Sequence, residues 1–136
     1  LNEFKPNLVV LAGFMRILSD FFVKNLQGKL MNIHPSLLPK YKGLNTHERA
    51  IKNGDKDAGF TIHFVTEELD GGPILYQKNV LIEKNDTPFS LSKKVMIEEH
   101  KAYPKVIGLF IHGRLKLHDG KIYLDGKILP KNGINF

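Results

Sequence analysis

The stretch Leu30-Met31-Asn32-Ile33-His34-Pro35-Ser36-Leu37-Leu38-Pro39 decides the fold class of this chain. Apolar residues lead into Asn32 and His34, and the prolines that follow end a strand. Alternate residues of an extended segment share one face, so an amide and an imidazole point the same way where the strand ends. Because ligands of open α/β sheets bind beyond the carboxyl ends of strands, we interpret this position as the edge of a catalytic site.

A second apolar run precedes this stretch, over Leu8-Val9-Val10-Leu11-Ala12-Gly13-Phe14. Such a run is typical of a fully buried strand in a parallel sheet. Ser19 predicts the start of a helix over 20–27, and the order strand, helix, strand predicts a right-handed parallel crossover. A central strand so near the first residue indicates that the N-terminal strands of the domain are absent from the sequence given.

Downstream, Thr46 predicts the start of a short helix that closes at Gly54, and residues 60–65 alternate in polarity as a strand does. Asp70-Gly71-Gly72-Pro73 predicts a turn into a return strand over 74–82.

Thr87 and Pro88 predict the start of the longest helix, and residues 115–128 predict small antiparallel hairpins. We therefore expect an α/β fold, Rossmann-like, with a mostly parallel sheet flanked by helices and with antiparallel hairpins toward the C-terminus. We expect residues 1–136 to form a single, partial catalytic domain.

The length, composition and net charge of the chain exclude several classes of protein. The 136 residues are 42% hydrophobic and 25% charged, which suits one globular domain with a core. No apolar run approaches the ~20 residues of a membrane span, and no secretory signal is evident. With no cysteine there is no disulfide framework, and we expect a cytoplasmic protein. The net charge of +6 comes from scattered lysines, which favours a basic surface over a nucleic-acid partner.

Asn32, His34 and Asp70 are the candidate catalytic residues. An amide N–H and an imidazole side by side can donate two hydrogen bonds to one oxygen, as stabilising an oxyanion requires. Asp70 precedes Gly71-Gly72. It is either an ordinary turn residue or a carboxylate that unusual backbone angles at the two glycines turn toward the site. In the second case it would favour the protonated form of His34.

Other titratable residues are open to two interpretations. His63 either lines the site or sits in a hydrogen-bonded polar layer. Glu99 interrupts the apolar stripe of the long helix, so we expect a ligand or a lysine beside it. No metal-ligand spacing and no phosphate-binding glycine loop is present. The remaining histidines are interpreted as surface or helix residues: His47, His100, His112 and His118.

Several motifs in order along the chain resemble the folate-dependent formyltransferases, and among them those that act on 5-phosphoribosylglycinamide. The resemblance covers essentially the whole chain. It rests on these segments: Ala12-Gly13-Phe14-Met15-Arg16-Ile17-Leu18, Asn32-Ile33-His34-Pro35-Ser36-Leu37-Leu38-Pro39, Gly43-Leu44-Asn45-Thr46-His47, His63-Phe64-Val65 and Leu69-Asp70-Gly71-Gly72-Pro73. The Thr46-His47 pair and the double glycine favour this branch over the methionyl-tRNA formyltransferases and the formyltetrahydrofolate hydrolases.

The resemblance implies a role for each matching residue. Asn32, His34 and Asp70 match the catalytic trio, and the Leu38–Pro39 bond matches a cis proline of the family. The positions implied to contact the folate are Met15, Arg16, Ile17, Leu18, Asn32, Thr66, Glu67, Leu69 and Asp70. The positions implied to contact the amine substrate are Pro35, Met96 and Glu99.

The implied activity is transfer of the formyl group of 10-formyltetrahydrofolate, the co-substrate, to the amine of 5-phosphoribosylglycinamide in purine biosynthesis. No metal, nucleic acid or membrane is implied, and the oligomeric state stays open. Two alternatives remain. The chain could hydrolyse the same folate, with water in place of the amine, or be a non-catalytic folate-binding fragment that lacks the N-terminal phosphate site.

Overall fold

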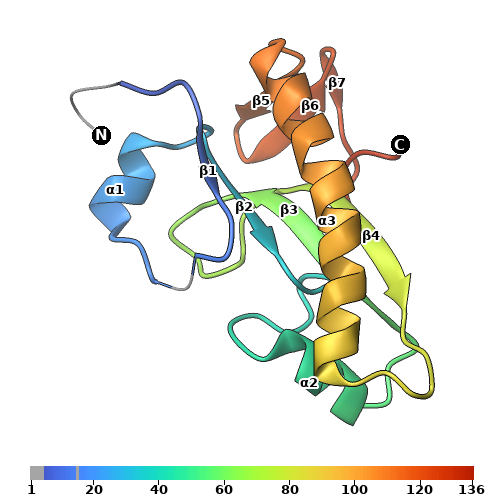
Figure 1. Cartoon of the computed structure of the whole chain (residues 1–136). Helices are drawn as coiled ribbons and strands as arrows, with labels where there is room; N and C mark the ends of the chain where they lie inside the picture. Colours follow the sequence, from blue (N-terminus) through green and yellow to red (C-terminus); the bar gives the residue numbers. More distant parts are fainter. Residues whose placement is uncertain (1–4, 15) are drawn as a thin grey trace.

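The computed structural model describes residues 5–14 and 16–136, in which helices flank one larger and one smaller sheet (Figure 1). The larger sheet holds β1 (Val9–Leu11), β2 (Leu30–His34), β3 (Asp57–Phe64) and β4 (Ile74–Leu81). The helices are α1 (Asp20–Asn25), α2 (Thr46–Lys52) and α3 (Pro88–Ile111). The smaller sheet holds β5 (Leu115–His118), β6 (Lys121–Leu124) and β7 (Lys127–Ile128).

The larger sheet has the strand order β1-β2-β3-β4, with β1 and β2 parallel and the other two pairs antiparallel. The α/β class is confirmed, but among the described strands fewer neighbouring pairs are parallel than expected. Parallel neighbours need a crossover that returns the chain to its starting end. Only the segment with α1, between β1 and β2, supplies one. The C-terminal hairpins are confirmed as β5, β6 and β7, paired antiparallel.

The helix starts follow from their capping residues. The Ser19 hydroxyl accepts from the Phe22 N–H, and Thr87 and Ser90 form a reciprocal capping box at α3, as Thr87-Pro88 predicted. At α2 the prediction is one residue off. Asn45, with φ 57°, occupies the cap position, and Thr46 is the first helical residue.

Helix α1 ends at Asn25, two residues before the predicted end. The chain there tightens into i→i+3 bonds, from Leu26 N–H to Val23 O and from Gln27 N–H to Lys24 O, before Gly28 reverses it at φ 74°. Strand β3 begins three residues before the predicted strand over 60–65 and ends one residue earlier.

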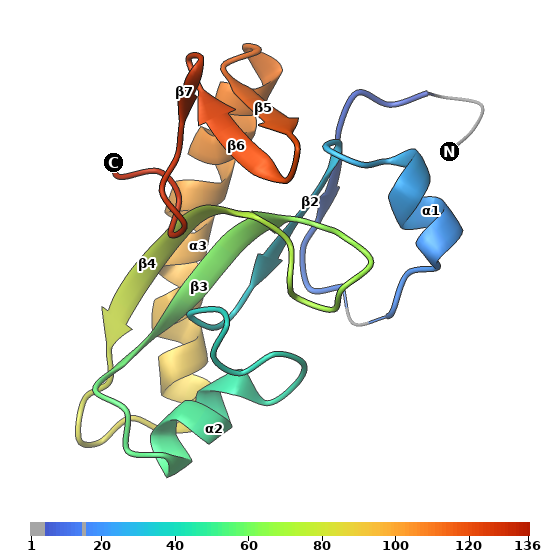
Figure 2. The same cartoon turned by 180° about the vertical axis from the view of Figure 1, so that it is seen from behind.

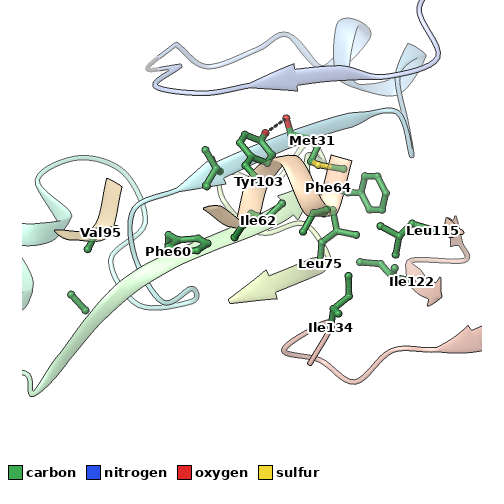
Figure 3. Close-up of a cluster of buried hydrophobic side chains, with 14 of the residues drawn as sticks. Met31, Phe60, Ile62, Phe64, Leu75, Val95, Tyr103, Leu115, Ile122 and Ile134 are labelled. Atoms are coloured by element: carbon green, nitrogen blue, oxygen red, sulfur yellow. Dashed lines mark hydrogen bonds between the residues drawn. The ribbon is translucent and has the colours of Figure 1, made fainter. Parts of the chain in front are cut away.

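One continuous apolar cluster joins both sheets to α3 (Figure 3). Helix α3 lies along the larger sheet, and the smaller sheet sits at its C-terminal end (Figures 1 and 2). The apolar stripe expected on the long helix comprises Leu91, Val95, Ala102, Val106 and Leu109 around Glu99; all but Leu109 and Glu99 are buried, and these two are half-buried. Within the described residues, no helix combines the length and apolar character that crossing a membrane requires.

Tyr103 fastens α3 to the parallel strands. Its hydroxyl donates to the Leu11 carbonyl at 2.7 Å and lies 3.3 Å from the Met31 carbonyl, the second contact being drawn in Figure 3. The bonds tie the helix to β1 and β2 just before the segments that carry the candidate site.

Candidate active site

A cavity of about 660 Å³ opens where β2 ends, between the loop after β1, the start of α2 and one side of α3. It gathers sequence-predicted residues from segments far apart in the chain. Those in its wall are Arg16, Ile17, Leu18, Asn32, His34, Pro35, Thr66, Glu67, Leu69, Asp70, Met96 and Glu99. Met15 lies outside the described residues. The predicted positions therefore share one cavity, although their individual roles remain predictions.

His34 is buried at the end of β2, with 6% of its surface exposed. Its Nε2 lies 2.9 Å from the Tyr41 carbonyl oxygen. A carbonyl only accepts, so Nε2 carries the hydrogen and donates it. The other ring nitrogen, Nδ1, lies 3.6 Å from Asp70 Oδ2. The ring is thus held by one nitrogen, while the other is left for the carboxylate and for a ligand.

The backbone angle of Asp70 and one hydrogen bond from the facing loop fix the position of its side chain. Its φ is 49°, the left-handed region that aspartate tolerates better than most residues. Its Oδ2 accepts from the Gly43 N–H at 2.9 Å. The side chain is 10% exposed, so its charge faces His34 with little water between them to screen it.

The two glycines after Asp70 do not supply the unusual angles expected of them, because the positive φ falls on Asp70 itself. Gly72 is needed for space. A Cβ there would overlap the Phe64 carbonyl oxygen, and backbone cannot give way as a side chain can. A Cβ on Gly71 would meet only the Glu68 side chain. The absence of a side chain at 72 lets this loop pack against β3.

The loop between β2 and α2 folds back over His34. The Leu38–Pro39 peptide bond is cis, as the family resemblance implied. Arg49 of α2 donates to the Lys42 and Leu44 carbonyls, at 2.7 and 3.0 Å, and its guanidinium stacks on the Tyr41 ring. These contacts fix the loop that presents the Tyr41 carbonyl to His34 and the Gly43 N–H to Asp70.

Asn32 and His63 face each other across β2 and β3, and both line the cavity. Asn32 Oδ1 and His63 Nε2 are buried with no hydrogen-bond partner. His63 Nδ1 lies 2.9 Å from the Phe64 carbonyl oxygen. Burial lowers the pKa of His63, and the Phe64 carbonyl and Asp70 offset part of that effect. Of the two interpretations offered for His63, cavity lining and a buried polar layer, the structure shows both.

Glu99 and Met96 reach the cavity from α3. Burial raises the pKa of the Glu99 carboxyl, and the nearby His100 offsets part of that effect. Within the described part of the chain Glu99 has no lysine partner, so of the two neighbours expected, a ligand remains the prediction. A half-buried carboxylate at a cavity wall can accept hydrogen bonds from hydroxyl groups of a ligand.

His47 of α2 and His100 of α3 are helix residues, as expected, and both also line the cavity. His47 is half-buried, its Nδ1 has no partner, and burial, together with the neighbouring His34, lowers its pKa. Its place in the cavity was not predicted, because the spacing from His34 to His47 fits no local pattern. The Arg49 contacts hold the loop between the two histidines.

The site has the donors that a developing oxyanion needs. Asn32 and His34 line one cavity, and the Asp70 carboxylate lies 3.6 Å from His34 Nδ1. Among the residues that the structure describes, no group of three or more His, Cys, Asp or Glu could hold a metal ion.

Comparison with known proteins places this geometry in a family. The family profile described as formyl transferase matches residues 1–107. The chain belongs to the formyl transferase family. This confirms the resemblance inferred from the motifs, and the described fold agrees with solved members.

The chain is 50% identical over 133 residues to "Phosphoribosylglycinamide formyltransferase" of Escherichia coli (strain K12). The match covers 98% of the chain and 63% of that protein. It is 47% identical over 123 residues to the human "Trifunctional purine biosynthetic protein adenosine-3", covering 90% of the chain and 12% of that protein. The chain thus spans less than two thirds of the length of these relatives.

Solved structures of related proteins have the same fold as this chain. Phosphoribosylglycinamide formyltransferase of Coxiella burnetii superposes with a TM-score of 0.92 at 48% identity, covering 97% of this chain and 62% of that one. A formyltetrahydrofolate deformylase of Pseudomonas syringae superposes with a TM-score of 0.84 at 30% identity, covering 90% of this chain and 41% of that one. The fold is therefore shared by relatives named as formyltransferases and by relatives named as deformylases.

Proposed function

We propose that this chain carries the catalytic centre for transfer of the formyl group of 10-formyltetrahydrofolate to the amine of 5-phosphoribosylglycinamide. The observation that carries the proposal is the convergence of Asn32, His34 and Asp70 on one cavity. The similarity to phosphoribosylglycinamide formyltransferases supports the identity of the two substrates. The core shared by both sheets supports one domain over the chain.

The reaction needs no covalent attachment to the protein. The substrate amine attacks the formyl carbon, and the carbonyl oxygen becomes an oxyanion. The Asn32 N–H and the Nδ1–H of protonated His34 donate to that oxygen. The bond between the formyl carbon and folate nitrogen then breaks, and the proton leaving the amine passes to that nitrogen.

Asp70 acts in two ways in this scheme. Its carboxylate, 3.6 Å from His34 Nδ1, would pair with the ring when His34 donates to the oxyanion. We also propose that Asp70 orders a water that relays the proton. Removing one oxyanion donor costs about 10²- to 10³-fold in rate in comparable sites, so each of the three residues should matter strongly.

The remaining wall residues divide between the substrates. We propose that Arg16 to Leu18 and the loop Thr66 to Leu69 border the folate, as the family resemblance implies for Met15 as well. We propose that Pro35, Met96 and Glu99 border the amine substrate. Both groups line the same cavity, which brings the two reactants to the Asn32 and His34 side chains.

The test is a formyl-transfer assay on the complete polypeptide that carries this sequence. His34→Ala and Asp70→Asn should each lower kcat by at least about 10²-fold. His118→Ala, an exposed histidine of β5 far from the cavity wall, is the matched control and should keep full activity. Near-normal turnover of either site variant would contradict the assignment. Folate consumption without the amine substrate would instead indicate the hydrolase activity named for the Pseudomonas relative.

A further inference from the structure

Two polar side chains form a cross-strand row with His34 but lie outside the cavity wall. The register sets His34 of β2 opposite Thr61 of β3, and Thr61 opposite Gln77 of β4. Opposed residues of such pairs share one face of the sheet. Thr61 is fully buried, and neither Thr61 nor Gln77 lines the cavity. Both are therefore placed to act on the site through other residues rather than through a ligand.

The Thr61 hydroxyl holds the loop after β2 at two points. It donates to the Ser36 carbonyl at 2.7 Å and accepts from the Leu38 N–H at 3.0 Å. Gln77 Nε2 donates to the same hydroxyl at 2.9 Å and to the Leu38 carbonyl at 2.7 Å. A carbonyl can only accept and an N–H can only donate, so the direction of every bond is fixed. The hydroxyl uses its one hydrogen and accepts twice, which leaves it fully satisfied.

The far end of the same loop makes the contact that orients His34. The Tyr41 carbonyl accepts from His34 Nε2 at 2.9 Å. The Ser36 hydroxyl donates to the Lys40 carbonyl at 2.6 Å and lies 3.2 Å from the Tyr41 carbonyl oxygen. Thr61 fixes the backbone of Ser36, and the Ser36 side chain extends that hold to the end of the loop.

We propose that Thr61 is a positioning residue for His34. Together with Gln77 it fixes the loop after β2, so that the Tyr41 carbonyl stays bonded to the Nε2 side of the ring. The Nδ1 side is thereby kept toward Asp70, 3.6 Å away. This inference rests on the proposed function, because it concerns the placement of one oxyanion donor. Misplacing a catalytic group by about 1 Å can cost on the order of 10²-fold in rate, which sets the scale of the expected effect.

Two substitutions at Thr61 separate its hydroxyl from its volume. Thr61→Val keeps the shape of the side chain but leaves the Ser36 carbonyl and the Leu38 N–H without this partner. Thr61→Ser keeps the hydroxyl and removes one methyl group. In the complete polypeptide we expect Thr61→Val to lower kcat by about 10- to 100-fold, with both KM values within about threefold of the wild type. Thr61→Ser should restore most of kcat.

A core variant outside the site controls for lost stability. Ile122 of β6 is buried in the apolar cluster and does not line the cavity. Ile122→Val removes one buried methyl group, so it should lower the urea midpoint and leave kcat at the wild-type value. A merely structural role of Thr61 would make Thr61→Val behave in the same way, with a lower midpoint and full kcat.

Gln77 tests the same loop from the next strand. Gln77→Met removes both hydrogen bonds of the side-chain amide and leaves the bonds of Thr61 to the loop, so it should lower kcat by less than Thr61→Val does. The combined variant should lose less than the product of the two single losses, because both residues act through one loop. Unchanged kcat in Gln77→Met would contradict the inference even if Thr61→Val failed to fold.

Nitrogen NMR of the His34 ring gives a readout that does not depend on activity. At about pH 9, where histidine rings are ordinarily neutral, the wild type should carry the ring hydrogen on Nε2. Thr61→Val should instead show a mixture of the two tautomers, because the Tyr41 carbonyl no longer stays in place. A merely structural role would leave the tautomer unchanged.

The outcomes distinguish this inference from the proposed function. A wild-type protein that transfers no formyl group to 5-phosphoribosylglycinamide would overturn the function, and the NMR comparison would still test the hold of Thr61 on His34. With an active wild type, four results would each overturn the inference. They are full kcat in Thr61→Val, an equal loss in Thr61→Ser, losses in Thr61→Val and Gln77→Met that multiply, and an unchanged His34 tautomer in Thr61→Val.

Discussion

Replacing Tyr103 with phenylalanine should loosen the folate side of the site while leaving the chemistry intact. The side chain is 8% exposed, and its hydroxyl is the group on α3 that bonds to Leu11 at the end of β1. One hydrogen is shared between the Leu11 carbonyl at 2.7 Å and the Met31 carbonyl at 3.3 Å, so the shorter contact dominates. Losing one buried hydrogen bond and leaving a carbonyl less satisfied costs about 1–2 kcal/mol.

The free energy of unfolding should fall by that amount, which lowers Tm by about 3–10 °C in a domain of this size. Leu11 leads directly into the segment whose Arg16, Ile17 and Leu18 line the cavity. Tyr103→Phe should therefore raise KM for the formyl donor more than it lowers kcat.

Urea denaturation and initial-rate kinetics on the same preparation check both expectations. Tyr123→Phe is the control, because its hydroxyl makes no hydrogen bond to the residues that the structure describes, and it should match the wild type. The reasoning fails if Tyr103→Phe and Tyr123→Phe unfold at the same urea concentration. It fails equally if Tyr103→Phe loses kcat while KM for the folate stays unchanged.

Two other predictions follow from the loop after β3 and from the buried histidines. Gly72→Ala should destabilise the protein by about 1–3 kcal/mol and lower kcat, because its Cβ would overlap the Phe64 carbonyl and displace Asp70. Gly71→Ala, whose Cβ meets only the Glu68 side chain, should be far milder; equal effects in thermal melts and rate assays would refute this. Burial lowers the pKa of His47 and of His63 below 6.5, so the unfolded chain binds protons that the folded one does not. The free energy of unfolding should then fall as the pH drops from about 6.5 toward the lowered pKa values of the two histidines. The fall should be less steep in His63→Gln, which lacks one of them. Urea midpoints at about pH 7.5 and about pH 5.5 test this, and a midpoint that rises on acidification would contradict it.

Local signals in the sequence predicted most of the elements because each had a specific physical cause. Ser19 and Thr87 have side chains that satisfy the first N–H groups of a helix, and both cap the helices expected of them. The alternation of Asn32 and His34 in an extended strand put both on one face, and both line the cavity. The parallel share of the sheet was overestimated, because pairing direction depends on the path of the connections rather than on the strands.

The site was predictable where residues are close in sequence and less so where a loop brings them together. No pattern in the sequence indicated that His47 would share a cavity with His34, since the contacts of Arg49 with the Lys42 and Leu44 carbonyls hold the loop between them only in the folded chain. The role of Gly72 was also missed. A residue without a Cβ is required there because the Phe64 carbonyl lies against Gly72, and the two are close only in the folded hairpin.

The loop between β2 and α2 contacts His34 and Asp70 through its main chain. The Tyr41 carbonyl holds His34, and the Gly43 N–H holds Asp70. Every amino acid but proline presents the same two groups, but the backbone angles decide where those groups point. Tyr41 and Gly43 themselves have positive φ, at 56° and 83°, and the Tyr41 ring packs under Arg49. Inserting or deleting a single residue would shift the carbonyl and the N–H together. Both the length of the loop and its left-handed residues are therefore what protein engineers must preserve here.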